Sequence, residues 1–427
     1  MTLDVMQTIE DHESVVRSYI RTFPKPFDKA QGVRVYDTDG YAYLDFFAGA
    51  SVLNYGHNHP ELLEPLIEYL KDGRIVHSLD LASVARAEFL DTFHRLILEP
   101  RGMSYRVQFP GPAGTNAVEA ALKIVRKVTG RHKVLSFTNA FHGMTVGSLA
   151  VTGNAFKRLG AGLPLTYSES MPYCGYFGPD VSTVDYVDRL LDDKGSGIDQ
   201  PAAIIVETVQ GEGGLAACSM DWLQGIEELC RRHGLLLIVD DIQTGNGRTG
   251  PFFSFEEAGI SPDVVTVSKS ISGFGLPMAL TLVKPEHDIW EPGEHNGTFR
   301  GHNLAFVTAK RALELFWSDR TLEQETERKA RRIHDALQAM IEKYPAVDGE
   351  HRGRGMMRGI RFRADSGLAS AVSDIAFEHG LIIETSGPKD DVLKLLPPLI
   401  IEDADLDEGL AIIERSIHEA MQRRGLA

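Results

Sequence analysis

Residues 235–243 read LLLIVDDIQ, and residues 263–270 read DVVTVSKS. Each stretch is an aliphatic run that ends abruptly in polar or charged residues. Such short, uniformly apolar runs are typical of strands that are buried on both faces of a parallel sheet. The carboxyl ends of parallel strands share one edge of the sheet, where α/β proteins bind their ligands. The sequence therefore predicts an α/β fold with Asp240 and Lys269 at that edge.

Asp240 and Lys269 are the two groups that pyridoxal phosphate chemistry requires. A lysine amine forms a Schiff base with the cofactor, and a carboxylate keeps the pyridine nitrogen protonated. A carboxylate and an amine at one sheet edge are also what a simple ion pair needs. The surrounding motifs decide between these two interpretations.

The length of the chain indicates two domains. With 427 residues it exceeds what a single compact core usually holds. We expect an amino-terminal arm at residues 1–60, a large cofactor-binding domain at 61–320 and a carboxyl-terminal small domain at 321–427. The arm is expected to form part of the small domain.

Charge and cysteine content exclude several classes of function. Lys and Arg number 44 against 60 Asp and Glu, and the net charge of −16 repels nucleic acid and anionic lipid. The 3 cysteines form no C-x-x-C pair, which argues against a disulfide framework and a zinc site. The amino-terminal residues lack a basic segment followed by an apolar one, and no apolar run approaches membrane-spanning length, so we expect no signal peptide and no transmembrane helix. We expect a cytoplasmic protein with no bound metal and no nucleic-acid or membrane partner.

A loop at residues 111–116, GPAGTN, leads into a strongly helical segment. Backbone amides at such a helix start bind phosphate, so Gly114 and Thr115 are candidates for a phosphate site. Small and polar residues also open many helices simply as caps. Beyond the strand expected at residues 133–137, Phe141 suits a position over a flat cofactor ring, although a purely structural core position explains it equally well.

Two further features lie close to the opening stretch. Residues 202–207, AAIIVE, form another buried strand that ends in a carboxylate, Glu207, and an amphipathic helix joins it to residue 235. Residues 245–250, GNGRTG, match the G-x-G-x-x-G pattern of dinucleotide sites. We reject a dinucleotide site because Pro251 and two phenylalanines follow, and the fingerprint works only by opening a helix.

The two ends of the chain carry weaker signals. We expect a short helix around residues 13–19 and a β-hairpin around Asp39 and Gly40. The segment 46–60 is rich in small residues, which lets its backbone approach a ligand or a second subunit closely. Near the carboxyl end, residues 353–362 predict a strand and residues 405–424 predict a helix.

With these motifs placed, the chain resembles the class III, or ω-type, aminotransferases over nearly its whole length. Residues 240–250, DDIQTGNGRTG, are similar to the family's DEVQTGFGRTG run, and residues 262–269, PDVVTVSK, are similar to its lysine segment. The resemblance implies pyridoxal phosphate fold type I, which is also that of aspartate aminotransferase. That fold has a large domain with a mostly parallel sheet and a smaller α+β domain built from both termini.

The resemblance implies catalytic roles for three residues. Lys269 would be the Schiff-base lysine and would shuttle a proton between two carbons. Asp240 would pair with the pyridinium nitrogen. Glu207 looks like the family's switch glutamate. Such a glutamate forms an ion pair with the substrate-binding cation when the bound substrate has no second carboxylate to pair with it.

The resemblance also implies contacts with the cofactor, pyridoxal 5'-phosphate. Gly114 and Thr115 would hold its phosphate, and Phe141 would stack on its ring. Gln243 would touch the phenolic oxygen of the ring. Thr298 would reach the phosphate bound by the neighbouring subunit, which makes a homodimer the minimum functional unit.

The chain departs from the family pattern at positions that bind substrate carboxylates. Met144 stands where many members have an arginine, and Lys394 stands at the expected switch arginine. A lysine cannot make the bidentate contact that arginine makes with a carboxylate. We hypothesise that Arg300 or Lys394 supplies a substrate-carboxylate contact, and we regard Ala50 and Tyr55 as the other substrate candidates.

Within the family, residues 46–49, FFAG, 53–58, LNYGHN, and 298–301, TFRG, look most like members that form L-2,4-diaminobutyrate. Those enzymes move the amino group of L-glutamate onto L-aspartate 4-semialdehyde and release 2-oxoglutarate, as the first step of ectoine biosynthesis. We therefore expect these two small molecules as substrates, with ping-pong kinetics. Siderophore pathways require the same product.

Three other interpretations stay open. The first keeps the fold and cofactor but uses 4-aminobutyrate, ornithine or acetylornithine as the amino donor. The second is a nucleotide-binding protein that uses residues 111–115 or 245–250 as a phosphate nest, and it predicts a colourless protein. The third is a non-catalytic binding protein, which leaves Lys269 and Asp240 without a role. The visible spectrum of the pure protein separates the last two from an enzyme that binds pyridoxal phosphate.

Overall fold

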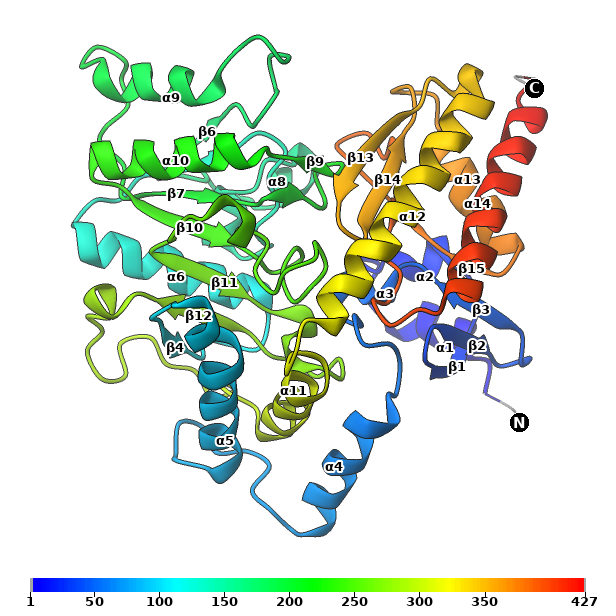
Figure 1. Ribbon diagram of the computed structural model, residues 1–427, viewed down its shortest axis with the longest axis horizontal. Coiled ribbons are helices and arrows are strands. Elements are labelled where there is room, and N and C mark those ends of the chain that lie inside the picture. Colours follow the sequence, from blue (N-terminus) through cyan, green and yellow to red (C-terminus); the bar gives the residue numbers. More distant parts are fainter. Residues whose placement is uncertain (1–2, 426–427) are drawn as a thin grey trace.

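The computed structural model describes residues 3–425 as two bodies joined through a long helix (Figure 1). The strands of the main sheet in the larger body are β4 (Arg106–Gln108), β5 (Val134–Phe137), β6 (Ser168–Met171), β7 (Ala203–Val206), β10 (Leu236–Asp240), β11 (Val264–Val267) and β12 (Leu280–Val283). They form a seven-stranded sheet in the order β4-β12-β11-β10-β7-β5-β6. Only β12 runs against the other strands of this sheet. The predicted, mostly parallel sheet is confirmed.

The central strand β10 shows why the opening stretch of the sequence is apolar throughout. Leu237 and Val239 belong to the apolar cluster that includes α10 (Met220–His233), and Ile238 belongs to the cluster on the other face with α6 (Gly114–Thr129). Successive side chains of a strand point to opposite faces, so a strand covered on both faces has no polar side.

The other helices of the larger body are α4 (Pro60–Lys71), α5 (Val84–Phe93), α7 (Val146–Ala150), α8 (Ala155–Leu159), α9 (Thr183–Asp192) and α11 (Asn303–Phe316). A π-helical turn at His94–Leu98 continues α5, and shorter turns lie at Glu99–Arg101, Glu256–Ala258, Lys269–Ser272 and Pro285–His287. A two-stranded ribbon is formed by β8 (Val209–Gln210) and β9 (Ala216–Ala217).

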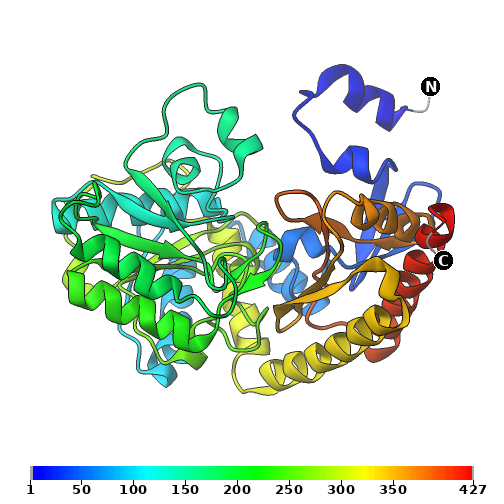
Figure 2. The ribbon, with the colours of Figure 1, turned by 90° about the horizontal axis from the view of Figure 1, so that it is seen from above.

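The second body is built from both ends of the chain, and both termini lie on it in Figure 2. Its first sheet has the order β1-β2-β3-β15, from β1 (Phe27–Gln31), β2 (Arg34–Asp37), β3 (Ala42–Asp45) and β15 (Leu381–Ile382). Its second sheet has the order β13-β14-β17-β16, from β13 (Glu350–Arg354), β14 (Met357–Arg361), β16 (Glu384–Ser386) and β17 (Val392–Leu395). The helices are α1 (Val5–His12), α2 (Tyr19–Thr22), α12 (Thr321–Lys343), α13 (Leu368–Glu378) and α14 (Asp403–Arg423).

The pairing of β3 with β15 joins the two ends of the chain in one sheet, with Leu44 beside Leu381. The divisions expected after residues 60 and 320 fall at the start of α4 and of α12. That these divisions separate independent domains stays a prediction. Among residues 3–425, no helix combines the length and the apolar character needed to cross a membrane.

The helix expected around residues 13–19 is wrong. α1 ends at His12, α2 begins only at Tyr19, and the backbone is extended at Glu13. The Arg17 guanidinium donates to the carbonyls of Glu13 at 2.7 Å and Ser14 at 2.8 Å. These side-chain bonds satisfy carbonyl groups that a helix would otherwise pair, so the irregular segment is stable.

The single strand expected at residues 353–362 is also wrong, because β13 and β14 form a hairpin there. The chain reverses at Gly355, where φ is +61° and an added Cβ would lie 2.4 Å from the Thr249 Cα. Only glycine fits this close approach in the left-handed region. The helix expected at residues 405–424 and the hairpin at Asp39 and Gly40 are confirmed by α14 and by β2 with β3.

Candidate active site

The carboxyl ends of the parallel strands β7, β10 and β11 point toward the second body in Figure 1. Residues at these three ends line a cavity of about 180 Å³. Glu207 follows β7, Asp240 ends β10, and Lys269 lies two residues beyond β11. All three line the cavity. The other lining residues are Gly114, Thr115, Phe141, His142, Gly143, Glu212, Ile242, Gln243 and Thr244. The fold thus brings together seven of the residues that the sequence singled out.

Asp240 is held in place by groups from neighbouring elements. His142 Nδ1 lies 2.6 Å from Asp240 Oδ2, and the Thr266 hydroxyl donates to Oδ1 at 3.0 Å. Burial by itself lowers the pKa of His142, but the adjacent Asp240 carboxylate outweighs burial and raises it. The contacts with His142 and Thr266 fix the position of the Asp240 carboxylate, which is the group that can pair with a cationic ring nitrogen.

Lys269 is buried and lies in the turn that follows β11. Burial lowers the pKa of its amine from 10.5 to about 8, with Lys394 adding to the effect and the Glu212 carboxylate opposing it. Its backbone φ of 56° is a left-handed conformation that costs a residue with a side chain roughly 1 kcal/mol. The amine is therefore unusually nucleophilic for a lysine near neutral pH.

The first turn of α6 offers donors for a phosphate. The amides of this turn are not capped by the side chain of Ala113, and the Thr115 hydroxyl lies 2.7 Å from the Thr145 hydroxyl. An added Cβ at Gly143 would lie 2.5 Å from the Thr115 hydroxyl, so only glycine leaves this hydroxyl accessible. Backbone amides at a helix start, with hydroxyl groups beside them, match a phosphate group.

Glu207 is tied to the backbone of its surroundings. Its carboxylate accepts from the amides of Phe141 at 2.9 Å and Gly211 at 3.3 Å. Burial raises the pKa of Glu207 to about 7, while His142 and these amides oppose the shift. The bond from the Phe141 amide holds the backbone that carries the Phe141 ring at the wall of the cavity.

Gln243 lies between the cavity and the amino-terminal arm. Its amide nitrogen donates to the Ala50 carbonyl at 3.2 Å and to Glu212 at 3.4 Å. The buried Gln243 Oε1 has no hydrogen-bond partner among the residues that the structure describes. With the carboxylate, the amine and the phosphate donors, this unsatisfied amide fits a flat, phosphorylated pyridine such as pyridoxal phosphate.

A buried ion-pair network adjoins the cavity. Lys394, from β17, is fully buried, and its amine lies 2.9 Å from Glu212 and 2.8 Å from Glu384 of β16. The Tyr19 hydroxyl donates to Glu384 at 3.3 Å. Burial raises the pKa of Glu212, but Lys394 and Lys269 outweigh burial and bring it to about 2. Glu212, rather than Glu207, is thus the carboxylate that pairs with the lysine at the expected switch position.

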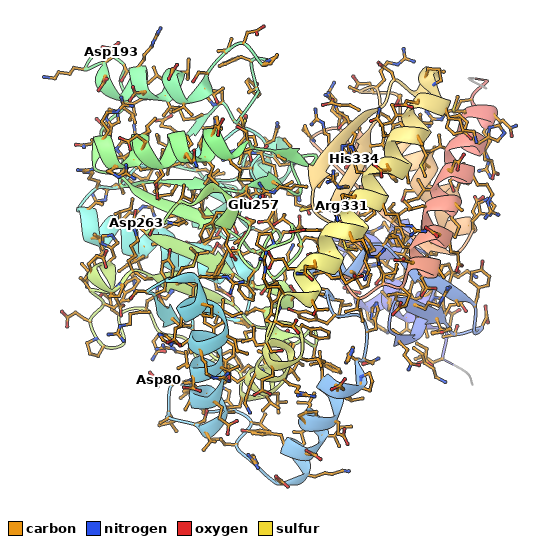
Figure 3. All side chains as sticks on the ribbon, viewed as in Figure 1. Asp80, Asp193, Glu257, Asp263, Arg331 and His334 are labelled. Carbon is orange, nitrogen blue, oxygen red and sulfur yellow. The ribbon has the colours of Figure 1, made fainter. Side chains whose placement is uncertain are left out.

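Thr298 and Arg300 do not line the cavity of their own chain. The Thr298 carbonyl lies 2.9 Å from His77 Nε2. The Arg300 guanidinium lies 3.5 Å from Asp80, which is labelled near α5 at the lower edge of the larger body in Figure 3. A contact of these two residues with substrate or cofactor thus stays a prediction.

The other two substrate candidates, Ala50 and Tyr55, are also outside the lining. Tyr55 is buried, stacks on Phe316 with ring centroids 4.5 Å apart, and accepts a hydrogen bond from the Trp317 ring nitrogen at 2.8 Å. Ala50 contacts the site only through the carbonyl that binds Gln243. Tyr55 thus supports the core between the segment 46–60 and α11.

Three residues of this site, Glu212, Glu384 and His142, were not predicted from the sequence. Glu212 lies in a glycine-rich loop, and nothing local connects it with Lys394, which is 182 residues away. Glu384 ends a short apolar run and pairs with Lys394 only because β16 and β17 are neighbours. Only His142 could have been suggested as a site residue from the sequence, because it directly follows the predicted site residue Phe141.

Comparison with known proteins identifies the family. The model of the family "Aminotransferase class-III" matches residues 17–417. A diaminobutyrate–2-oxoglutarate transaminase of Virgibacillus pantothenticus is 55% identical over 98% of this chain and 100% of the relative. A protein of the same name from Streptomyces avermitilis is 57% identical, with 98% of each chain covered. The crystal structure of ornithine aminotransferase from Toxoplasma gondii is 26% identical and superimposes with a TM-score of 0.86 over 99% of this chain and 97% of that one.

The geometry and the comparisons agree. The predicted lysine, carboxylate and phosphate loop converge on one cavity at the carboxyl edge of a type I sheet. The family match spans the elements that carry them. This chain therefore belongs to the class-III aminotransferase family and is an enzyme that uses pyridoxal phosphate.

Proposed function

We propose that this enzyme transfers the amino group of L-glutamate to L-aspartate 4-semialdehyde, giving L-2,4-diaminobutyrate and 2-oxoglutarate. The observation that carries the proposal is the alignment, over almost the full length of both chains, with relatives named for this reaction. The net charge of −16 is compatible with a salt-tolerant host, which supports ectoine biosynthesis as the pathway. We also propose a cytoplasmic location, because all three cysteines are unpaired.

The residues around the cavity have distinct roles in this reaction. Bound pyridoxal phosphate supplies an electron-withdrawing ring that stabilises negative charge on the reacting carbon. Lys269 holds the cofactor and moves a proton to and from that carbon. Asp240, supported by His142, keeps the ring nitrogen protonated. Thr115 and the first amides of α6 bind the phosphate.

The test is a product assay with the purified protein. Incubation with L-glutamate and L-aspartate 4-semialdehyde should yield L-2,4-diaminobutyrate and 2-oxoglutarate in equal amounts, which mass spectrometry detects. Initial rates at several concentrations of both substrates should give the parallel double-reciprocal lines of ping-pong kinetics. A higher kcat/KM with 4-aminobutyrate, ornithine or acetylornithine as amino donor would overturn the assignment of substrate, and a colourless protein would overturn the assignment of cofactor.

The two amino donors of this reaction differ at the reacting carbon, and we propose that Lys394 and Glu212 respond to this difference. Glutamate carries a carboxylate on the reacting carbon, whereas diaminobutyrate carries only hydrogen there. A cation must therefore be offered to one and withdrawn from the other. Lys394 between Glu212 and Glu384 is arranged for this purpose, because a glutamate carboxylate can replace Glu212 as its partner. Arg300 is the second candidate, if it reaches the cavity of a partner subunit.

Lys394→Met is expected to raise KM for glutamate about 10-fold or more, because one charge-assisted contact is lost. KM for diaminobutyrate should change by less than about twofold, since that substrate has no carboxylate at the reacting carbon. Steady-state kinetics in both directions measure this split, with Lys394→Arg as the charge-conserving control and Arg300→Met as the competing candidate. If both methionine variants keep the wild-type KM for glutamate, neither residue binds its carboxylate.

Loading of the cofactor-free enzyme should accelerate as pH rises through about 8. Only the neutral amine of Lys269 attacks the cofactor aldehyde, and burial places its pKa at about 8 instead of 10.5. The amine is protonated below this pH and neutral above it, so the rate increases with pH and then levels off. The visible absorbance after mixing with pyridoxal phosphate follows the rate between pH 6 and 10. A midpoint near 10.5 would contradict the lowered pKa.

We further propose a homodimer as the minimum functional unit. Thr298 lies outside the cavity of its own chain, and large apolar side chains are exposed on the segments around it. These are Ile75, Val76, Leu79, Leu81 and Phe299. An apolar surface of this kind is typical of a permanent interface. Mass photometry should find dimers or multiples of dimers at nanomolar concentration, and a monomeric active enzyme would contradict the proposal.

A further inference from the structure

The two amino donors of the proposed reaction share one feature. In L-glutamate, the side-chain carboxyl carbon lies three bonds from the reacting α-carbon. In L-2,4-diaminobutyrate, the α-carboxyl carbon lies three bonds from the reacting γ-carbon. We call this group the distal carboxylate. A single fixed cation at this distance from the cofactor can therefore bind both substrates.

Met144 is the residue at the position where related enzymes have a carboxylate-binding arginine, and it cannot serve here. Its side chain is apolar and 54% exposed. Lys394 is fully buried between two carboxylates, and the Arg300 guanidinium is paired with Asp80 outside the cavity. The distal carboxylate thus lacks a partner among the residues that the sequence suggested.

Lys157, from α8, is not itself among the lining residues of the cavity, but its amine lies beside two residues that are. Its amine lies 4.2 Å from the centroid of the Phe141 ring and 4.0 Å from Glu212 Oε2. Phe141 and Glu212 are both walls of the cavity that holds Lys269. The Lys157 side chain is 31% exposed, and its amine donates no hydrogen bond within residues 3–425. Its three donors are therefore free for a ligand.

The short helix α8, which carries Lys157, is held in place by several hydrogen bonds to the segment before it. The next residue, Arg158, donates to the carbonyls of Leu149 at 3.1 Å, Ala150 at 3.0 Å and Thr152 at 2.7 Å. At the start of the segment, the Gly153 amide donates to the Ala140 carbonyl at 2.7 Å, one residue before Phe141. These bonds fix the backbone of α8 to the loop that carries Phe141, so Lys157 and the ring move together.

We propose that Lys157 is the specificity-determining residue that binds the distal carboxylate in both halves of the reaction. This inference rests on the proposed function. The contact with the face of the Phe141 ring holds the Lys157 amine beside the cavity wall. The ion pair with Glu212 is long, at 4.0 Å, so its loss costs little free energy when a substrate carboxylate replaces Glu212. The distal carboxylates of the two substrates have different neighbouring groups and therefore differ in orientation. An ammonium group suits both because, unlike a planar guanidinium, it binds a carboxylate without fixing the orientation of that carboxylate.

The test compares Lys157→Met, Lys157→Arg and a matched control, Lys194→Met, in the enzyme with its cofactor bound. Lys194 is an exposed lysine in the loop after α9. In Lys157→Met, KM for glutamate and for diaminobutyrate should rise about 10- to 100-fold with kcat nearly unchanged, the size of one lost charge-assisted contact. Lys157→Arg should recover most of the loss, and Lys194→Met should behave as wild type.

Two probes separate binding of the carboxylate from a structural effect. The first is 1,3-diaminopropane, which is diaminobutyrate without its carboxylate, and its kcat/KM should be equal in wild type and Lys157→Met. The second is glutarate, which has the carboxylates of glutamate but no amine and cannot react. Its dissociation constant, measured by calorimetry, should rise by the same factor as KM for glutamate, and this measurement decides the matter if 1,3-diaminopropane is not turned over.

An unchanged glutarate affinity in Lys157→Met would overturn the inference, and so would an equal loss of activity with 1,3-diaminopropane. Failure of the proposed function is distinguishable, because it shows in the wild-type enzyme as the absence of diaminobutyrate among the products. Failure of the inference shows as a wild-type enzyme that forms diaminobutyrate and a Lys157→Met variant that does so with the same KM values.

Discussion

Lys269→Ala should lower turnover by more than about 10⁴-fold, because one substitution removes both the covalent attachment of the cofactor and the group that moves the proton. Alanine has neither a nucleophile nor a titratable group, and the buried amine of Lys394 is held by two carboxylates. The visible absorbance that arises from attachment to Lys269 should disappear with the activity. Stopped-flow spectroscopy of the glutamate half-reaction measures both effects in one experiment.

Lys194→Ala, a change of the same kind at an exposed position, should retain the wild-type rate and spectrum. Thermal unfolding of both variants checks that the fold is intact. Persistence of the absorbance and of turnover in Lys269→Ala would show that the lysine after β11 is not the attachment site. The assignment of the whole cavity would then fail with it.

Asp240→Asn is expected to lower kcat about 10²- to 10⁴-fold while leaving the cofactor bound. Asparagine has nearly the same size but no charge, so the ring nitrogen loses the anion that keeps it protonated. The neutral ring withdraws electrons less strongly from the reacting carbon, and removal of the proton from that carbon becomes slow. The variant should therefore stay coloured but react slowly, and single-turnover measurements with glutamate check this separation.

His142 makes the Asp240 prediction more specific. It is buried, and its only charged neighbour within hydrogen-bond distance among the described residues is Asp240. In Asp240→Asn, the cause of its raised pKa is removed, and burial then lowers the pKa and favours neutral imidazole. Asp193→Asn, at an exposed position labelled in Figure 3, is the matched control. A variant Asp240→Asn with a rate within about threefold of wild type would contradict the role of the carboxylate.

Much of the cavity was predictable from local sequence. β7, β10 and β11 are uniformly aliphatic because they are covered on both faces, and this pattern identifies buried parallel strands without any knowledge of their neighbours. Parallel strands place their carboxyl ends together, so the acids and the amine that follow them must be close. Residues 245–250 were rejected as a dinucleotide site because no helix was expected after them, and in the structure turns and a short 3-10 helix at Glu256–Ala258 follow instead of an α-helix.

Interactions between distant segments were not predictable in the same way. The partner of Lys394 depends on how β17 lies against the loop after β7, and no local pattern encodes that contact. Glu207 and Glu212 both follow β7 closely, and only the position of the second body decides that Glu212 pairs with Lys394. Tyr55 was a substrate candidate, but its side chain packs on Phe316 and accepts a hydrogen bond from Trp317 in the core.

The sequence by itself determined the chemistry of this protein. Asp240, Lys269 and the loop at residues 111–116 follow or precede strongly patterned elements, and their roles depend on local order along the chain. The tertiary structure alone decided which charged groups are free to meet a substrate. Lys394 is paired with carboxylates from two other segments, whereas the Lys157 amine lies beside Phe141 and Glu212 of the cavity wall and donates no hydrogen bond among the described residues. The physical reason is that electrostatic pairing depends on distance in space, and for residues far apart in the chain only the folded path sets that distance.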